Sequence, residues 1–116
     1  MSLILAGAEE DPAARLLPQL EHLGFSVLPA SDDKVVMDLC EHTVPEAVIV
    51  ASLDQARTLA TEHPRIPLVL LSDDAPDPSF MLEALRLGVS DVWPMPMSSE
   101  EIADRLAAVW FHKTAV

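Results

Sequence analysis

Carboxylates are the side chains best placed for chemistry in this sequence of 116 residues. They follow three short apolar runs, at residues 9–11, at Asp54 and at residues 73–74. Divalent cations such as Mg²⁺ prefer oxygen ligands, provided that several of them meet at one point. The middle one of these three runs, which precedes Asp54, ends in Ala51, and alanine supplies no side-chain oxygen. We therefore interpret these acids as solvated loop residues, with a cation site as the less favoured alternative.

The other reactive residue types lack the partners that their chemistry requires. Cys40 is the only cysteine and has no neighbouring base, so we interpret it as a small core residue. Gly7 is the only glycine at the end of an apolar run, which excludes a glycine-rich phosphate loop. Glu-His pairs at 21–22, 41–42 and 62–63 fall near the ends of predicted helices, where histidine can interact with the helix dipole. The chemistry of these residues predicts neither a cofactor nor a metal.

These residues must be positioned by five short apolar runs that alternate with helical patterns. The predicted strands cover residues 3–6, 25–28, 47–51, 68–71 and 91–93. The predicted helices cover residues 12–23, 32/33–42, 53–63 and 78–87, with a last helix capped by Ser98 or Ser99. Pro18 falls inside the first helix, where we expect a kink or a later start.

The order of these elements predicts the fold class. Apolar runs without strict alternation, each followed by a helix, indicate a parallel sheet covered by helices on both faces. A chain of 116 residues is too short for an eight-stranded barrel. We predict a five-stranded, doubly wound α/β sheet, a flavodoxin-like three-layer sandwich that forms one domain over residues 1–116.

Composition restricts the partners. The chain has 7 Lys plus Arg and 19 Asp plus Glu, a net charge of −12, which disfavours nucleic acid and anionic membranes. Half of the residues are apolar, yet no run approaches the roughly 20 residues that span a bilayer. With no visible secretory leader and a single cysteine, the sequence predicts a cytoplasmic protein.

Three segments resemble the receiver domains of bacterial response regulators. They are residues 45–51 (PEAVIVA), 66–72 (IPLVLLS) and 84–98 (ALRLGVSDVWPMPMS). In the last of these, a helix, a glycine, a short strand, a proline and a capped helix follow one another in the family's order. The resemblance covers nearly the whole chain and implies a receiver-like signalling domain of a two-component phosphorelay, not an enzyme.

Carried over position by position, the resemblance implies a degenerate phosphorylation site. The family's phospho-accepting aspartate corresponds to Ala51 and its lysine to Met95. Its acidic pair falls on residues 7–8 or 9–10, depending on the end from which the loop is counted, and its hydroxyl falls on Ser72. The positions of this site are Gly7, Ala8, Glu9, Glu10, Ala51, Ser72 and Met95.

The replacements remove what phosphoryl transfer requires, which is a nucleophilic carboxylate, a metal held by acids and a cation. An alanine cannot be the nucleophile, and a thioether cannot neutralise charge. A long apolar side chain fills the volume of the lysine without leaving a charge unpaired. We therefore expect Ala51, Met95 and Trp93 to pack together in a closed pocket, and we expect Ala51→Asp to destabilise the fold.

The resemblance implies a function through surfaces. Receiver-like domains usually signal through their fourth helix, fifth strand and fifth helix. The corresponding residues here are Met81, Arg86, Val92, Pro94, Met97, Glu101, Arg105 and Trp110. We expect a phosphorylation-independent interaction module of a larger signalling protein, which binds protein partners or neighbouring domains, or forms a homodimer through this face.

Two alternative functions remain open. Atypical receiver domains at the N-terminus of pilus-assembly ATPases also lack the acceptor aspartate, and they serve localisation. An active phospho-acceptor that uses a displaced carboxylate, such as Asp54 or Asp73, is the other alternative.

Overall fold

Five strands alternate with five helices in the computed structural model, which describes residues 2–7, 9–10, 13–72 and 77–114, with side chains to residue 110. The strands are β1 (Ser2–Ala6), β2 (Ser26–Ala30), β3 (Ala47–Val50), β4 (Leu68–Ser72) and β5 (Asp91–Pro94). The helices are α1 (Ala13–His22), α2 (Asp33–His42), α3 (Leu53–Glu62), α4 (Pro78–Arg86) and α5 (Ser99–Thr114). Each predicted strand and helix is confirmed, and its predicted ends differ from the observed ends by no more than two residues.

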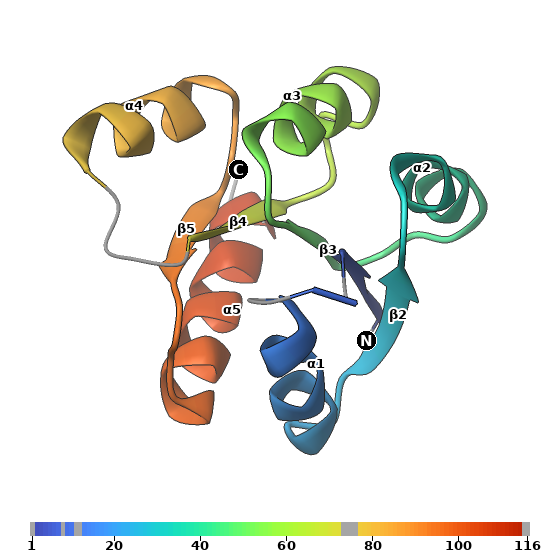
Figure 1. Ribbon diagram of the computed structural model, residues 1–116, viewed down its shortest axis with the longest axis vertical. Helices are drawn as coiled ribbons and strands as arrows, with labels where there is room; N and C mark the ends of the chain where they lie inside the picture. The colour runs from blue at the N-terminus through green and yellow to red at the C-terminus, as the bar shows by residue number, and fades with distance from the viewer. Residues whose placement is uncertain (1, 8, 11–12, 73–76, 115–116) are drawn as a thin grey trace.

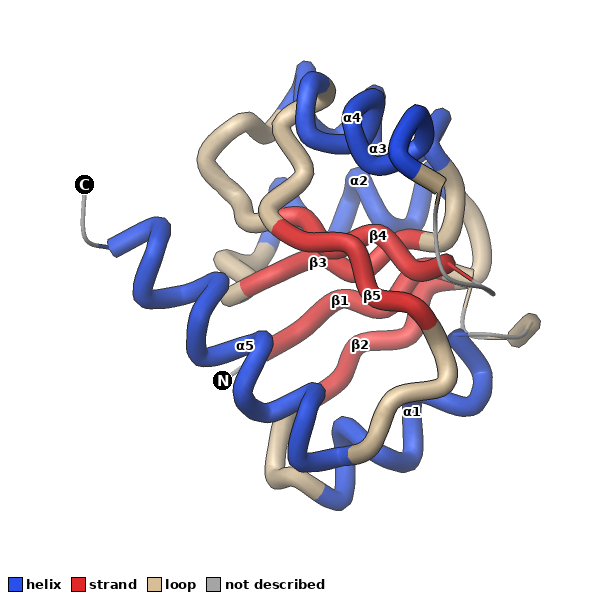
Figure 2. Tube along the Cα trace, turned by 90° about the vertical axis from the view of Figure 1, so that its left-hand side faces the viewer, coloured by secondary structure: helices blue, strands red, loops and turns tan. Residues whose placement is uncertain are grey.

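The sheet is parallel throughout, in the order β2-β1-β3-β4-β5. Helices α1 and α5 cover one face, and α2, α3 and α4 cover the other, as Figures 1 and 2 show. Successive side chains of a strand point to opposite faces, so each strand feeds two apolar clusters. Leu3 and Leu5 join the cluster under α1 and α5, whereas Ile4 and Ala6 join the cluster under the other three helices. The predicted doubly wound, flavodoxin-like fold is confirmed.

Local chemistry accounts for most of the helix ends. The side chains of Asp32, Ser52, Asp77 and Ser98 each accept a hydrogen bond from the backbone N–H three residues further on. Such N-caps satisfy an amide that has no partner inside the helix. Beyond the carboxyl ends, Gly24 and Gly88 take φ values of +96° and +95°, which glycine adopts without strain.

Helix α1 corrects one expectation. It begins at Ala13 and continues through Pro18, so of the two outcomes expected for Pro18 the later start is wrong, and the kink stays a prediction. Pro18 is exposed, and the opposite side of the helix buries Leu16 and Leu20 against the sheet. Burial of these side chains outweighs the single backbone hydrogen bond that proline cannot make.

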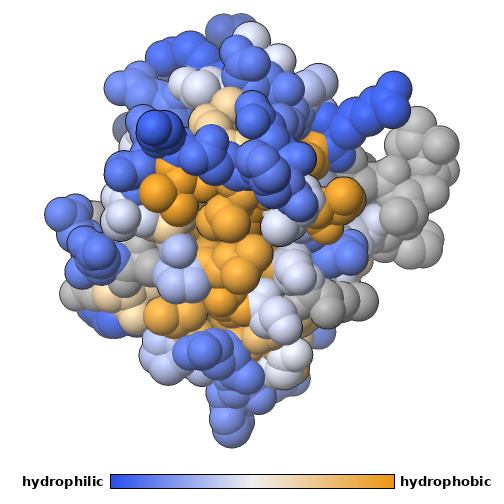
Figure 3. All heavy atoms as spheres, turned by 90° about the vertical axis from the view of Figure 1, so that its right-hand side faces the viewer, coloured by the Kyte–Doolittle hydropathy of each residue, from blue (hydrophilic) through white to orange (hydrophobic). Residues whose placement is uncertain are grey.

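The side of the molecule formed by edge strand β2 exposes apolar surface, which Figure 3 shows between polar regions. Val27 and Leu28 of this strand are only half-buried. Pro29 lies in the same strand and lacks a backbone N–H, which suits an edge and limits pairing with another strand. Within the part of the chain that the structure describes, no helix is long and apolar enough to cross a bilayer.

Candidate functional site at the carboxyl edge of the sheet

Gly7, Ala51 and Met95 follow strands β1, β3 and β5, and Ser72 ends β4, so these four positions picked out by the sequence lie along one edge of the sheet. The backbone N–H of Gly7 donates to the carbonyl of Ala30 at 2.8 Å, which joins the ends of β1 and β2. The backbone N–H of Met95 donates to the carbonyl of Ser72 at 2.8 Å, which joins the ends of β4 and β5. Ala51 follows the central strand β3, between these two pairs. Parallel strands thus bring these positions to the edge where α/β folds bind ligands.

Ala51 corrects the expectation of a closed pocket. Strand β3 ends at Val50, one residue earlier than predicted, and Ala51 is exposed. Only Ala51 and Ser52 connect β3 to α3, and the Ser52 hydroxyl accepts the backbone N–H of Gln55 at 3.1 Å. Because the chain turns into a capped helix at once, it carries Ala51 to the surface and leaves no loop between the two elements to cover it.

Met95 and Trp93 are buried as expected, in an apolar cluster that does not include Ala51. Met95 is 7% exposed, and Trp93 is fully buried. Both belong to the apolar cluster under α1 and α5, together with Met97. Gln19 of α1 donates a side-chain hydrogen bond to the Met97 carbonyl at 2.9 Å, which fixes the turn after β5. The thioether of Met95 is therefore a core side chain.

The acids of this edge do not form a described cluster. Glu9 and Glu10 are exposed, and the backbone N–H of Glu10 donates to the Gly7 carbonyl at 3.0 Å in a turn. Asp54 is exposed and accepts from the Arg57 guanidinium at 3.0 Å. Among the residues whose placement is described, no three His, Cys, Asp or Glu side chains could hold a metal ion together. Ala8, Asp11, Asp73 and Asp74 lie outside the described residues.

Comparison with known proteins relates this architecture to a signalling fold. No protein-family model and no curated protein matches the sequence. Among solved structures, NtrX from Brucella abortus in complex with ADP matches 98% of this chain with a TM-score of 0.83 at 16% identity. A response regulator receiver domain protein from Clostridium thermocellum matches 98% with a TM-score of 0.80, also at 16% identity. The receiver domain of an HD domain-containing protein from Pseudomonas fluorescens Pf-5 matches 98% with a TM-score of 0.80 at 20% identity.

The chain has the receiver fold of response regulators. It spans 27% of the NtrX chain but 97% of the Clostridium thermocellum chain, so the match is to a receiver unit. At these identities the likeness establishes the fold, and the chemistry must be argued from the side chains of this chain.

A polar network between β5 and α5 escaped the sequence analysis. The indole N–H of Trp93 donates to one Asp91 carboxylate oxygen at 2.9 Å, and Arg105 donates to the other at 3.2 Å. Arg105 also donates to the Val92 carbonyl at 3.3 Å. Asp91 and Trp93 are two residues apart on a strand and therefore lie on the same side of it, which was the available signal. The network gives the buried indole its acceptor and anchors the last helix of the receiver fold.

The predicted interaction face is only partly exposed. Arg86 and Glu101 are exposed, and Met81, Pro94 and Arg105 are half-buried. Val92 and Met97 are buried, so the expectation that they contribute to the surface is wrong. Val92 packs in the apolar cluster under α2, α3 and α4, and Met97 packs in the cluster under α1 and α5.

The side chain of Trp110 makes its contacts inside the domain. Its ring meets that of Phe25 edge-on, with centroids 5.6 Å apart and planes at 62°. Its indole N–H donates to the Glu46 carbonyl at 3.1 Å. This packing lies at the amino edge of the sheet and covers much of a side chain that was expected to contact a partner.

Helix α4 carries exposed apolar residues that the sequence analysis missed. Leu82 is 50% exposed and Leu85 is 56% exposed, whereas Ala84 is the helix's buried contact with the sheet. Residues three apart on a helix share a face, so the two leucines form one patch. The signal was available, because a helix that is apolar on several sides cannot bury them all against one sheet.

Proposed function

We propose that the chain is a phosphorylation-independent, receiver-like domain of a two-component-type signalling protein in the cytoplasm. The observation that carries this proposal is the pair of residues at the centre of the carboxyl edge. Ala51 has no nucleophilic atom, and Met95 is committed to the core. These two positions therefore supply neither the group that would accept a phosphoryl nor the cation that would neutralise it.

The domain acts, in this proposal, through a surface on α4 that we define by Leu82 and Leu85. Contacts between proteins are built around apolar residues with charged residues at the rim. Arg86 and Glu83 lie next to these leucines and supply such a rim, with Glu83 3.8 Å from Arg57 of α3. The partner is a neighbouring domain of a larger signalling protein, a separate protein or a second copy.

Phosphorylation is tested by intact-mass measurement after incubation with acetyl phosphate and Mg²⁺. We expect the mass to stay unchanged, because Ala51, at the proposed acceptor position, has no nucleophilic atom. Asp54 is the described carboxylate nearest to Ala51 in the sequence, so Asp54→Asn serves as the matched control. A gain of one phosphoryl mass in the native chain that disappears in this variant would establish the displaced-acceptor alternative instead.

The α4 surface is tested by sedimentation over a range of concentrations. If the partner is a second copy, the native chain shifts toward a dimer and the double variant Leu82→Ser, Leu85→Ser remains monomeric. Salt should favour the dimer, because it screens the repulsion between copies of charge −12. Val44→Ser is the control, since Val44 is 92% exposed and lies on another part of the surface. A native chain that stays monomeric at every concentration excludes the homodimer, and equal dimerisation of all variants excludes this surface.

A further inference from the structure

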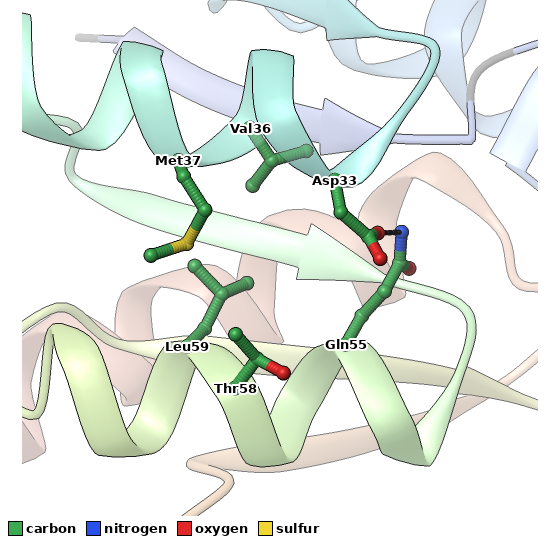
Figure 4. Close-up of a pocket in the computed structure, with 6 residues that line it drawn as sticks. All are labelled: Asp33, Val36, Met37, Gln55, Thr58 and Leu59. Carbon is green, nitrogen blue, oxygen red and sulfur yellow. Dashed lines mark hydrogen bonds between the residues drawn. The ribbon is translucent and has the colours of Figure 1, made fainter.

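A shallow hollow lies between α2 and α3, and it is lined neither by the carboxyl-edge positions nor by residues of α4. Figure 4 shows the side chains that line it, three from each helix. They are Asp33, Val36, Met37, Gln55, Thr58 and Leu59.

The floor of this hollow is apolar. Val36 and Leu59 are each 2% exposed and face one another between the helices, with half-buried Met37 beside them (Figure 4). The hydroxyl of Thr58 donates to the carbonyl of Asp54 in its own helix at 3.1 Å. Because that hydroxyl is satisfied, the wall needs no polar group from a ligand, and an apolar side chain suits the hollow.

One end of the hollow is closed by a hydrogen bond. The side-chain amide of Gln55 donates to the Asp33 carboxylate at 2.7 Å, and this bond joins the first turns of α3 and α2 (Figure 4). The two helices therefore begin side by side and run in the same direction along the sheet.

The other end of the hollow is acidic. Glu41 follows Met37 by four residues, and Glu62 follows Thr58 by four, so each acid continues the helix face that lines the hollow. Both are exposed and lie in the last turns of their helices, where the helix dipoles add partial negative charge. The nearest described cation of α3, Arg57, is already shared between Asp54 and Glu83 at 3.0 and 3.8 Å.

We propose that this α2–α3 groove docks an amphipathic helical segment of a protein partner. An apolar side chain of that segment fills the hollow, and lysine or arginine side chains further along it meet Glu41 and Glu62. Two parallel helices offer a groove into which a third helix packs. From Asp33 to Glu41 the groove runs for about 12 Å at 1.5 Å per residue, which corresponds to about two turns of the docked helix. The acidic end and the net charge of −12 favour a basic segment over an anionic membrane.

The probe is an alanine-based helical peptide that carries a leucine pair and, one turn further on, a lysine pair. The measurement is the change in backbone amide NMR signals of the full chain during titration. We expect shifts in α2 and α3 and none in α4. A matched peptide with glutamates in place of the lysines should bind about ten-fold more weakly, which is about 1.4 kcal/mol.

Two double variants that change the net charge equally distinguish binding in this groove from attraction by the net charge of the chain. Glu41→Lys with Glu62→Lys should weaken binding of the lysine peptide about ten-fold, and Glu100→Lys with Asp104→Lys should leave it within about two-fold. The second pair changes exposed acids of α5, on the other face of the sheet. Thr58→Arg, at an exposed position in the hollow, should abolish binding because it fills the site with a cation.

Three results would overturn the proposal. Equal weakening by the two double variants would mean that the peptide responds only to net charge. Shifts centred on α4 would assign binding to the proposed α4 surface instead. Concentration-dependent shifts of α2 and α3 without peptide would identify a second copy as the occupant. The first two outcomes leave the test of phosphorylation untouched, so failure here is distinguishable from failure of the proposed function.

Discussion

Replacing Met95 by lysine tests whether this thioether is a core residue, as we propose for the position that corresponds to the receiver family's lysine. Met95 is 7% exposed and packs in the cluster that includes Trp93 and Met97. Burial of a side chain of this size stabilises a fold by about 1.5–3 kcal/mol relative to exposure. The variant loses this contribution, because a lysine either buries its ammonium or extends it into solvent and leaves a void.

The expected loss of unfolding free energy is about 2–3 kcal/mol, since Ala51 offers no carboxylate to pair with the new ammonium. For a chain of this length that corresponds to a fall in Tm of about 10 °C. Urea denaturation followed by tryptophan fluorescence measures it directly, because Trp93 is fully buried in the folded state. We expect the midpoint to fall at an unchanged slope, which would show a loss of stability without a change in the surface exposed on unfolding.

Ala51→Asp is the matched control. Ala51 is exposed, so a carboxylate there remains hydrated and should change stability by no more than about 0.5 kcal/mol. This reverses the expectation drawn from the sequence, which placed Ala51 in a closed pocket. An unchanged midpoint for Met95→Lys would refute the core role of Met95. A cost for Ala51→Asp that equals the cost of Met95→Lys would restore the closed pocket.

Two further predictions concern the core. Asp91→Ala removes the acceptor of the Trp93 indole and the partner of Arg105, so urea denaturation should show a loss of about 1–3 kcal/mol, and an unchanged midpoint would contradict the network. Burial, with a smaller contribution from the charge of Glu41, raises the pKa of the Cys40 thiol. The folded state therefore holds this proton more tightly than the unfolded state, and stability should fall as the pH rises above the thiol's ordinary pKa. Urea midpoints across alkaline pH measure this fall, which Cys40→Ala should reduce, and an identical pH dependence in that variant would exclude the thiol as its source.

The arrangement of strands and helices was predictable because its determinants are local. Apolar runs without alternation identify strands buried on both faces, and Ser52 and Asp32 mark helix starts through their own side-chain hydrogen bonds. The succession of five such units then leaves few topologies. The positions that meet at the carboxyl edge follow from this topology alone, without any knowledge of side-chain packing.

Exposure was less predictable, because it depends on which helix covers a residue. Ala51 follows a fully buried strand in the sequence, yet the immediate start of α3 carries it to the surface. Met97 lies in a turn beside exposed residues, yet α1 reaches it through Gln19 and the cluster below covers it. Leu82 and Leu85 belong to an apolar helix that packs against the sheet through buried Ala84 and partly buried Phe80 and Met81, which leaves the two leucines exposed. For Met97 the deciding contact comes from an element distant in the sequence, whereas for Ala51, Leu82 and Leu85 it is the way their own segment meets the sheet.

The two proposed surfaces lie on neighbouring helices, and the contact between those helices bears on how the domain works. Arg57 of α3 lies 3.0 Å from Asp54 of its own helix and 3.8 Å from Glu83 of α4. About half of the Arg57 and Glu83 side chains is exposed, so this bridge between the helices contributes no more than about 1 kcal/mol. A contact of that strength can transmit no more than its own free energy from one surface to the other. Occupation of the α2–α3 groove should therefore change affinity at the α4 surface by about five-fold or less. Under the two proposals the domain would then hold two partners side by side with weak coupling, and a larger coupling would require a bistable element other than this bridge.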